Sequence, residues 1–218
     1  VVTYQRRFQP QFRYMKQFIT SPEFGRINVL SAFQSQAWLV GTAGKWRQKL
    51  SLSGGGQIND SGSHIVDVLM WALPEPVTAV SCINDNRGTE VDIDSQIIFR
   101  TAAGTLGSLT VLGSAPHQGM VEDITISGDK GCSLYIRRGV GDMKVMASRE
   151  VKGALEDISE EMQSCGSTDP DTHFIQLLRG EVTENESAPE NFLPTIQFTE
   201  ACWRSAEQGG KFVEIKPA

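Results

Sequence analysis

The stretch VDIDSQIIFRTAAGTLGSLTVLG, residues 91–113, predicts two strands, 91–100 and 105–113, joined by a turn at Ala103-Gly104. In the first strand the apolar residues take one set of positions, Val91, Ile93, Ile97 and Phe99, and polar residues take the other, Asp92, Asp94, Gln96 and Arg100. Successive side chains of a strand point to opposite faces. One face is therefore expected to meet the core, and the other to meet solvent or an interface.

Further strand patterns lie on both sides of this hairpin. They cover residues 26–34, 77–83, 121–127, 132–138, 143–149 and 212–215. In residues 26–34, Ile27, Val29 and Phe33 are expected to share one side. The turns between the central strands are short, which predicts a mostly antiparallel sheet.

Four helices are predicted around these strands. The first begins near Pro10 and ends at Ile19, and the second, residues 61–73, is apolar on nearly every side. A third helix carries Phe174, Leu177 and Leu178 on one stripe and ends at Gly180; a fourth covers residues 192–208. Residues 41–56, 156–171 and 181–190 are expected to be loops or links. The predicted class is α+β: an open sheet with helices on one face, forming a single domain over residues 1–218.

Composition excludes several classes of protein. The net charge of -6 opposes binding to phosphate backbones, so no nucleic acid partner is expected. No apolar stretch is long enough to span a bilayer, and no membrane association is expected. Four widely spaced cysteines without a C-x-x-C pair predict reduced thiols and a cytoplasmic protein. The chain begins with Val1 and is expected to be part of a longer enzyme.

The segment WRQKLSLSGGGQINDSGSHIVDVLMW, residues 46–71, contains the candidate catalytic residues. Asp60 and His64 are four residues apart at the start of a helix, which places both side chains on one face. Three glycines just before them allow close approach of the backbone to another group. Spacing alone leaves two interpretations open: an acid–base pair, or a helix cap beside a core histidine.

This segment resembles the C-terminal domain of the glucose-fructose oxidoreductase and inositol dehydrogenase family, Gfo/Idh/MocA. The matching features are Trp46-Arg47, the glycines at positions 54–56, and Asp60 with His64. YQRRFQP at 4–10, ISGDKGCSLYI at 126–136 and EACWRSAEQGGKFVEI at 200–215 extend the resemblance over nearly the whole chain. It implies a glyceraldehyde-3-phosphate dehydrogenase-like C-terminal domain, whose partner Rossmann domain, absent from this chain, would bind NAD or NADP.

The resemblance also implies an activity, namely hydride transfer between the nicotinamide and a hydroxyl of a sugar, sugar derivative or cyclitol. His64 would be the proton acceptor or its partner, and Asp60 would orient the substrate hydroxyl. The family's catalytic lysine has no counterpart here, and no Gly-x-Gly-x-x-Gly turn occurs, so this chain alone is expected to be inactive. Two alternatives stay open: an NAD-dependent glycosidase-type enzyme of the same fold, and a non-catalytic binding or oligomerisation module.

Four more residues are candidates for binding. Trp46 and Arg47 are expected to contact substrate or cofactor across a cleft, with a surface ion pair as the alternative. Arg7 is expected to face substrate or to form an interdomain salt bridge. His173 is expected either to enter the site or to lie in solvent at a helix end. No metal site is expected, because these residues share no ligand spacing beyond the Asp60–His64 pair.

The second face of the sheet carries apolar residues as well. Ile98 lies among the polar positions of its strand, and Leu106 and Leu112 lie opposite Leu109 and Val111 in the next. Apolar residues on both faces predict that both faces are buried. The chain is therefore expected to form a homodimer or homotetramer through the sheet face.

Overall fold

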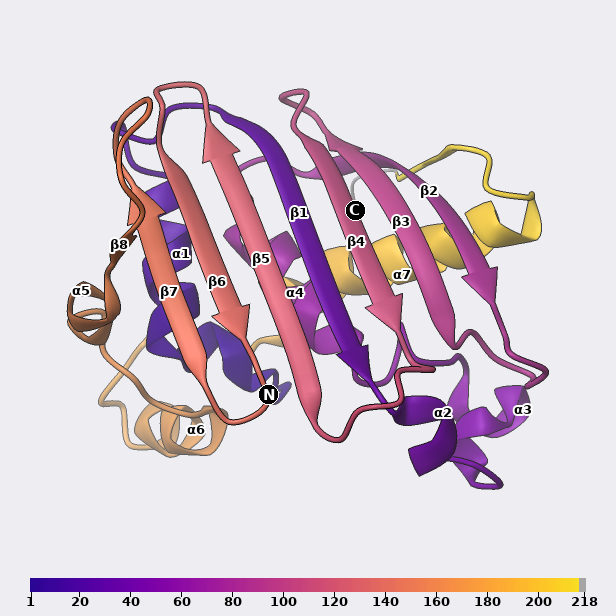
Figure 1. Ribbon diagram of the computed structural model, residues 1–218. Coiled ribbons are helices and arrows are strands. Elements are labelled where there is room, and N and C mark those ends of the chain that lie inside the picture. The colour runs from indigo at the N-terminus through magenta and orange to yellow at the C-terminus, as the bar shows by residue number, and fades with distance from the viewer. Residues whose placement is uncertain (216–218) are drawn as a thin grey trace.

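A nine-stranded open sheet forms one layer of the protein (Figure 1). The computed structural model describes residues 1–215. The strand order is β8-β7-β6-β5-β1-β4-β3-β2-β9. The strands are β1 Ile27–Gln36, β2 Val77–Asp85, β3 Asp94–Thr101, β4 Leu106–Leu112, β5 Met120–Gly128, β6 Ser133–Arg138, β7 Met143–Ser148, β8 Glu156–Asp157 and β9 Val213–Glu214. The α+β class and the mostly antiparallel sheet are thus confirmed.

Strand β1 enters the sheet between two strands that follow each other in the chain. It pairs parallel with β4 and antiparallel with β5, so β4 and β5 are not neighbours. The register of β1 against β5 shifts between Ile27 and Val29, as in a β-bulge. The prediction that Ile27 and Val29 share a side is wrong, because this shift turns Val29 to the open face while Ile27 and Leu30 are buried.

Helices cover one face of the sheet, as Figure 1 shows. They are the short 3₁₀ helix η1, Gln5–Phe8, followed by α1 Pro10–Ile19, α4 Ser63–Ala72 and α7 Leu193–Glu207. One large apolar cluster fills the space between these helices and the sheet. Burial of such apolar surface supplies most of the driving force for folding. None of the helices within residues 1–215 has the length and apolar character needed to cross a bilayer.

Shorter elements lie at two edges of the molecule. The predicted loop 41–56 contains two of them, η2 Trp46–Gln48 and α3 Leu50–Ser53, and α2, Trp38–Gly41, ends where the loop begins. The predicted link 156–171 is wrong in part, because it contains β8 and the helix α5, Ser159–Gln163. The remaining helices are α6 Pro170–Leu178 and η3 Pro189–Phe192. In α6 the predicted apolar stripe stays exposed at Phe174 and Leu178, and Pro170 and His173 are buried instead.

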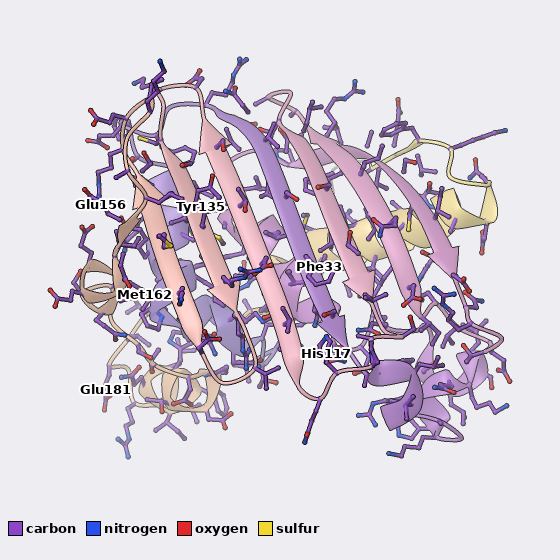
Figure 2. All side chains as sticks on the ribbon, in the orientation of Figure 1. Phe33, His117, Tyr135, Glu156, Met162 and Glu181 are labelled. Atoms are coloured by element: carbon purple, nitrogen blue, oxygen red, sulfur yellow. The ribbon has the colours of Figure 1, made fainter. Side chains whose placement is uncertain are left out.

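Strand β3 begins at Asp94, three residues later than predicted. Asp92 therefore precedes the strand and is buried, whereas the sequence placed it on the polar face. The open face of the sheet carries Phe33 and Tyr135 (Figure 2). The single domain over residues 1–218 stays a prediction; Lys216, Pro217 and Ala218 lie outside the described residues.

Candidate functional site

The glycine-rich turn before α4 is fixed by a buried carboxylate. Asp92 is 5% exposed, and its two oxygens accept hydrogen bonds from the backbone N–H groups of Gly56 and Ile58, both at 2.9 Å. Trp203 of α7 donates its Nε1–H to Asp92 Oδ1, also at 2.9 Å. A Cβ on Gly56 would lie 2.0 Å from the Asp92 carbonyl oxygen, so only glycine fits there. Asp92 thus holds the turn that leads to Asp60.

Asp60 is held at its outer end by two donors. Its Oδ2 accepts hydrogen bonds from Trp38 Nε1 and from Arg47 Nε, both at 2.9 Å. The Arg47 guanidinium also stacks on the Trp46 ring, with 4.6 Å between its carbon and the ring centroid. Within residues 1–215 no group bonds to Oδ1, and the side chain is 38% exposed. The structure therefore brings together Trp46, Arg47 and Asp60, and adds Trp38, which the sequence did not suggest.

His64 lies in the first turn of α4, half buried beneath the N-terminal segment. The rings of His64 and Tyr4 are in edge-to-face contact, with 5.2 Å between the two ring centroids. Burial lowers the pKa of His64 from its usual 6.5, and the positive charge of Arg6 lowers it further, while Asp60 opposes both. The imidazole is consequently neutral at pH 7. Its Nδ1 is buried without a hydrogen-bond partner among the described residues.

The other two candidates lie apart from this group. Arg7 is buried and donates from Nε and Nη2 to the two oxygens of Asp67, at 2.9 and 2.6 Å. Its guanidinium also lies 4.0 Å from the Phe192 ring centroid. The salt bridge of Arg7 is therefore made with Asp67 of this same chain. His173 is 4% exposed, packs on Phe8, and accepts a hydrogen bond from Glu186 N at Nε2. The structure thus does not bring Arg7 or His173 to Asp60.

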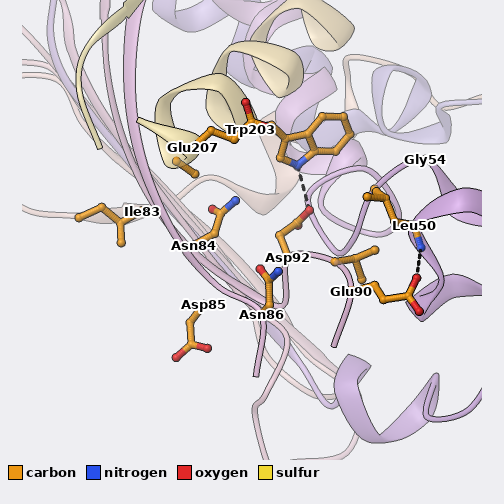
Figure 3. A pocket seen from close by; sticks show the side chains of 13 residues that line it. Leu50, Gly54, Ile83, Asn84, Asp85, Asn86, Glu90, Asp92, Trp203 and Glu207 are labelled. Atoms are coloured by element: carbon orange, nitrogen blue, oxygen red, sulfur yellow. Dashed lines mark hydrogen bonds between the residues drawn. The ribbon is translucent and has the colours of Figure 1, made fainter. Parts of the chain in front are cut away.

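A hollow of about 710 Å³ lies on the Asp92 side of the turn (Figure 3). The residues that line it include Trp203, Asp92, Asn84, Asn86 and Glu207. Glu90 accepts a hydrogen bond from the Leu50 N–H at its edge. Asp60 and His64 do not line this hollow. The carboxylates around it are mostly satisfied by neighbours of this chain, as at Asp92.

A family model described as the GFO/IDH/MocA C-terminal domain matches residues 12–133, more than half of the chain. The chain belongs to this family. The match includes Trp46, Arg47, Asp60 and His64, and it confirms the resemblance found from the sequence. Among curated proteins the sequence has no match.

Solved structures of oxidoreductases share the fold of this GFO/IDH/MocA C-terminal domain. The WlbA dehydrogenase from Chromobacterium violaceum, in complex with NADH and UDP-GlcNAcA, matches with TM-score 0.78 and 22% identity over 100% of this chain and 63% of its own. Levoglucosan dehydrogenase, in complex with NADH and levoglucosan, matches with TM-score 0.79 and 16% identity over 99% of this chain and 66% of its own. An oxidoreductase domain protein from Kribbella flavida matches with TM-score 0.79 and 15% identity over 97% of this chain and 64% of its own. The chain therefore spans about two thirds of the length of these proteins.

Proposed function

We propose that this chain is the substrate-binding domain of an NAD(P)-dependent oxidoreductase that acts on a hydroxyl of a sugar, sugar derivative or cyclitol. The observation that carries the proposal is the arrangement at the start of α4. There, Asp60 lies in the turn before the helix and is held by Trp38 and Arg47, and His64, whose pKa is lowered, follows four residues later in the first turn of α4. The WlbA and levoglucosan dehydrogenase structures, which share the fold, contain NADH and sugar ligands and give the proposal its substrate class.

The two candidate catalytic residues have separate tasks in this proposal. Oxidation of a hydroxyl requires a group that takes up its proton, and a neutral imidazole does so near pH 7. His64 is such a group because its pKa is lowered by burial and by Arg6. Asp60 keeps Oδ1 unbonded among the described residues while Trp38 and Arg47 fix Oδ2. It would accept a hydrogen bond from the substrate hydroxyl and so orient it toward His64.

The cofactor is NAD or NADP in this proposal, and it would be held mainly by another domain. A pyrophosphate site needs a glycine-rich turn between a parallel strand and a helix. In residues 1–215 the one parallel pair is β1 with β4, and no Gly-x-Gly-x-x-Gly turn joins them, so this chain does not fit the dinucleotide. Trp46 and Arg47 would contact the cofactor from this side. When bound, the nicotinamide takes up the hydride.

The sheet face would join copies of the chain into a homodimer or homotetramer. Val29, Ile98 and Leu106 lie on adjacent strands of this face and are 48–60% exposed. Together with Phe212 they surround a shallow hollow of about 610 Å³. A contiguous exposed apolar patch of this kind is typical of an interface. We expect Ile98→Asp to shift the chain toward monomer in sedimentation velocity, while Val40→Asp, at an exposed site in α2, leaves the assembly unchanged.

Replacing His64 in the full-length enzyme tests the proposed function. We expect His64→Asn to lower turnover by roughly 10²- to 10⁴-fold, the range for loss of a positioned acid or base. The assay follows nicotinamide reduction with a panel of sugars and polyols, under conditions where hydride transfer limits the rate. His117→Asn is the matched control, since His117 bonds to Ser35 and lies in the loop between β4 and β5 rather than in α4. A loss of less than threefold for His64→Asn would remove His64 from the proposal.

A further inference from the structure

A buried ion pair lies behind His64, where no part of the proposed reaction uses it. Arg6 of η1 is 3% exposed and forms a salt bridge with Glu122 of β5, which is 5% exposed. On the outer side, Arg138 of β6 approaches the second oxygen of Glu122 at 3.7 Å. Burying two charges costs a large desolvation energy, and proteins retain such pairs in part where position or specificity depends on them. We therefore ask what the Arg6–Glu122 pair positions in this protein.

Contacts connect Arg6 with the start of α4. Arg6 Nη2 lies 4.0 Å from Met120 Sδ, and Gln34 Nε2 lies 3.1 Å from the same sulfur. Gln34 Nε2 also donates to Ser61 O at 3.1 Å, and the His64 N–H donates to that oxygen at 3.4 Å. On the other side, Tyr4, two residues before Arg6, touches the His64 ring. Arg6 and His64 thus belong to one packed cluster.

Four buried polar atoms in this cluster and its ion pair have no hydrogen-bond partner among residues 1–215. They are Arg6 Nη1, Gln34 Oε1, His64 Nδ1 and Glu122 Oε1. Glu122 also faces Arg138, so one carboxylate lies between two cations and does not belong to Arg6 alone. Because the surroundings of Arg6 exclude water, the remaining field of its charge is weakly screened and reaches the imidazole.

We propose that Arg6, fixed by Glu122, is a positioning residue that acts on His64 by its charge and holds the imidazole in the uncharged form that accepts a proton. This inference rests on the proposed function of His64. Arg6 contacts no substrate in this proposal, since it is buried and paired. Its positive charge disfavours protonation of the His64 imidazole, which would place a second positive charge nearby.

The charges around His64 make this effect specific to Arg6. Burial lowers the pKa of His64 first, Arg6 is the next cause, and Asp60 acts in the opposite direction. Tyr4 contacts the imidazole through its aromatic ring. The pKa of Arg6 itself is lowered, first by burial; Glu122 and Asp67 oppose this lowering, and Arg138 adds to it. No other cation is a cause of the His64 shift.

Titration of the imidazoles by NMR in the 218-residue chain tests the inference directly. The chain has 3 histidines, so the ring signals can be assigned by replacing each in turn. In Arg6→Met the titration midpoint of His64 is expected to move up, because the like charge is gone. In Glu122→Gln it is expected to move down, because the Arg6 charge is less compensated. Arg6→Lys keeps a cation and is expected to stay close to the native midpoint.

Arg13→Met is the matched control. Arg13 also pairs with a carboxylate, Glu186 at 2.9 Å, but it is not a cause of the His64 shift. Its removal is expected to leave the His64 signal unchanged at every pH. Thermal unfolding reports whether each variant folds. If Arg6→Met does not fold, the double variant Arg6→Met/Glu122→Met, which removes both buried charges, is expected to show an upward movement that is smaller, because the opposing charge of Glu122 is lost as well.

An unchanged His64 midpoint in folded Arg6→Met, or an upward movement in Glu122→Gln, would overturn the inference. Neither result bears on the proposed function, which depends on His64→Asn in the full-length enzyme. If the function holds, Arg6→Met in that enzyme should move the acid limb of the kcat/KM profile to higher pH, and Arg6→Lys should restore it. If His64→Asn has no effect on turnover, the NMR result still shows whether Arg6 acts on the imidazole.

Discussion

Two aspartates act on the segment between α3 and α4, and they do so in opposite ways. Asp92 is buried and turns both oxygens inward, to Gly56, Ile58 and Trp203. Asp60 is partly exposed, uses one oxygen for Trp38 and Arg47, and keeps the other unbonded within the described chain. Asp92 accepts three hydrogen bonds from the protein and uses both oxygens, whereas Asp60 accepts two on one oxygen and keeps Oδ1 for a ligand. The comparison separates a carboxylate that builds the site from one that is available for chemistry.

The largest effect is expected from removing the inner carboxylate. Asp92→Ala leaves two backbone N–H groups and the Trp203 indole N–H buried without an acceptor, and each lost partner is costly. We expect a loss of about 3–5 kcal/mol in the free energy of unfolding. Asp60→Ala is the matched control, with an expected loss of about 1 kcal/mol because its surroundings are partly solvated. Urea unfolding measures both, and equal losses would contradict the comparison.

Two glycines of the same turn offer a smaller test. Gly56 lies against the Asp92 backbone, where a Cβ would be 2.0 Å from O and 2.7 Å from N. Gly56→Ala must displace this contact and should cost about 2–3 kcal/mol. Gly54 has a positive φ of 71° but open space around it, so Gly54→Ala should cost only about 1 kcal/mol, from backbone strain. A reversed order in thermal or urea unfolding would show that Asp92 does not hold the turn tightly.

Sequence patterns were sufficient for most of the secondary structure. Alternation in residues 91–100 predicted the buried face of β3, since Ile97 and Phe99 are buried. In β4 the pattern placed Leu109 and Val111 on one face but left open which face is buried, and the structure buries these two. The pattern could not predict that β1 lies between β4 and β5, because strand order depends on long-range pairing. Nor could it predict the bulge near Ile27, which changes the faces of β1.

The candidate site was predictable only in part. The four-residue spacing and the Trp46-Arg47 pair located a group that the structure does bring together around Asp60. The role of Asp92 was missed, because one of its partners is 111 positions away in the chain and its own strand pattern suggests a solvent-facing residue. The pairing of Arg6 with Glu122 could not be predicted either, because the two residues lie far apart in the sequence. A buried charge becomes visible only when its tertiary neighbours are known.

The smallest expected effect concerns the pH dependence of stability. It distinguishes the two aspartates because the charge of Asp60, unlike that of Asp92, acts on the pKa of His64. The pKa of His64 is lowered in the folded chain, by burial first and then by Arg6, so the unfolded chain binds more protons below its usual value of about 6.5. The stability that a neutral His64 contributes is therefore complete above about pH 6.5 and is lost as the pH falls toward the lower, folded-state pKa. Comparing urea unfolding of the native chain with His64→Gln at a series of pH values isolates this contribution.

Asp60 opposes the lowering of the His64 pKa, so Asp60→Asn should make the loss of stability on acidification larger and extend it to lower pH. Asp92 is not among the causes of the shift, so its buried carboxylate contributes to the His64 difference only through the fold. The relevant quantity is the difference in the free energy of unfolding between the chain with His64 and the chain with His64→Gln. In a folded Asp92→Asn background, the pH dependence of this difference should be unchanged. If Asp60→Asn also left that difference unchanged, Asp60 would be a second structural anchor, and it would lose its place beside His64 in the proposed reaction.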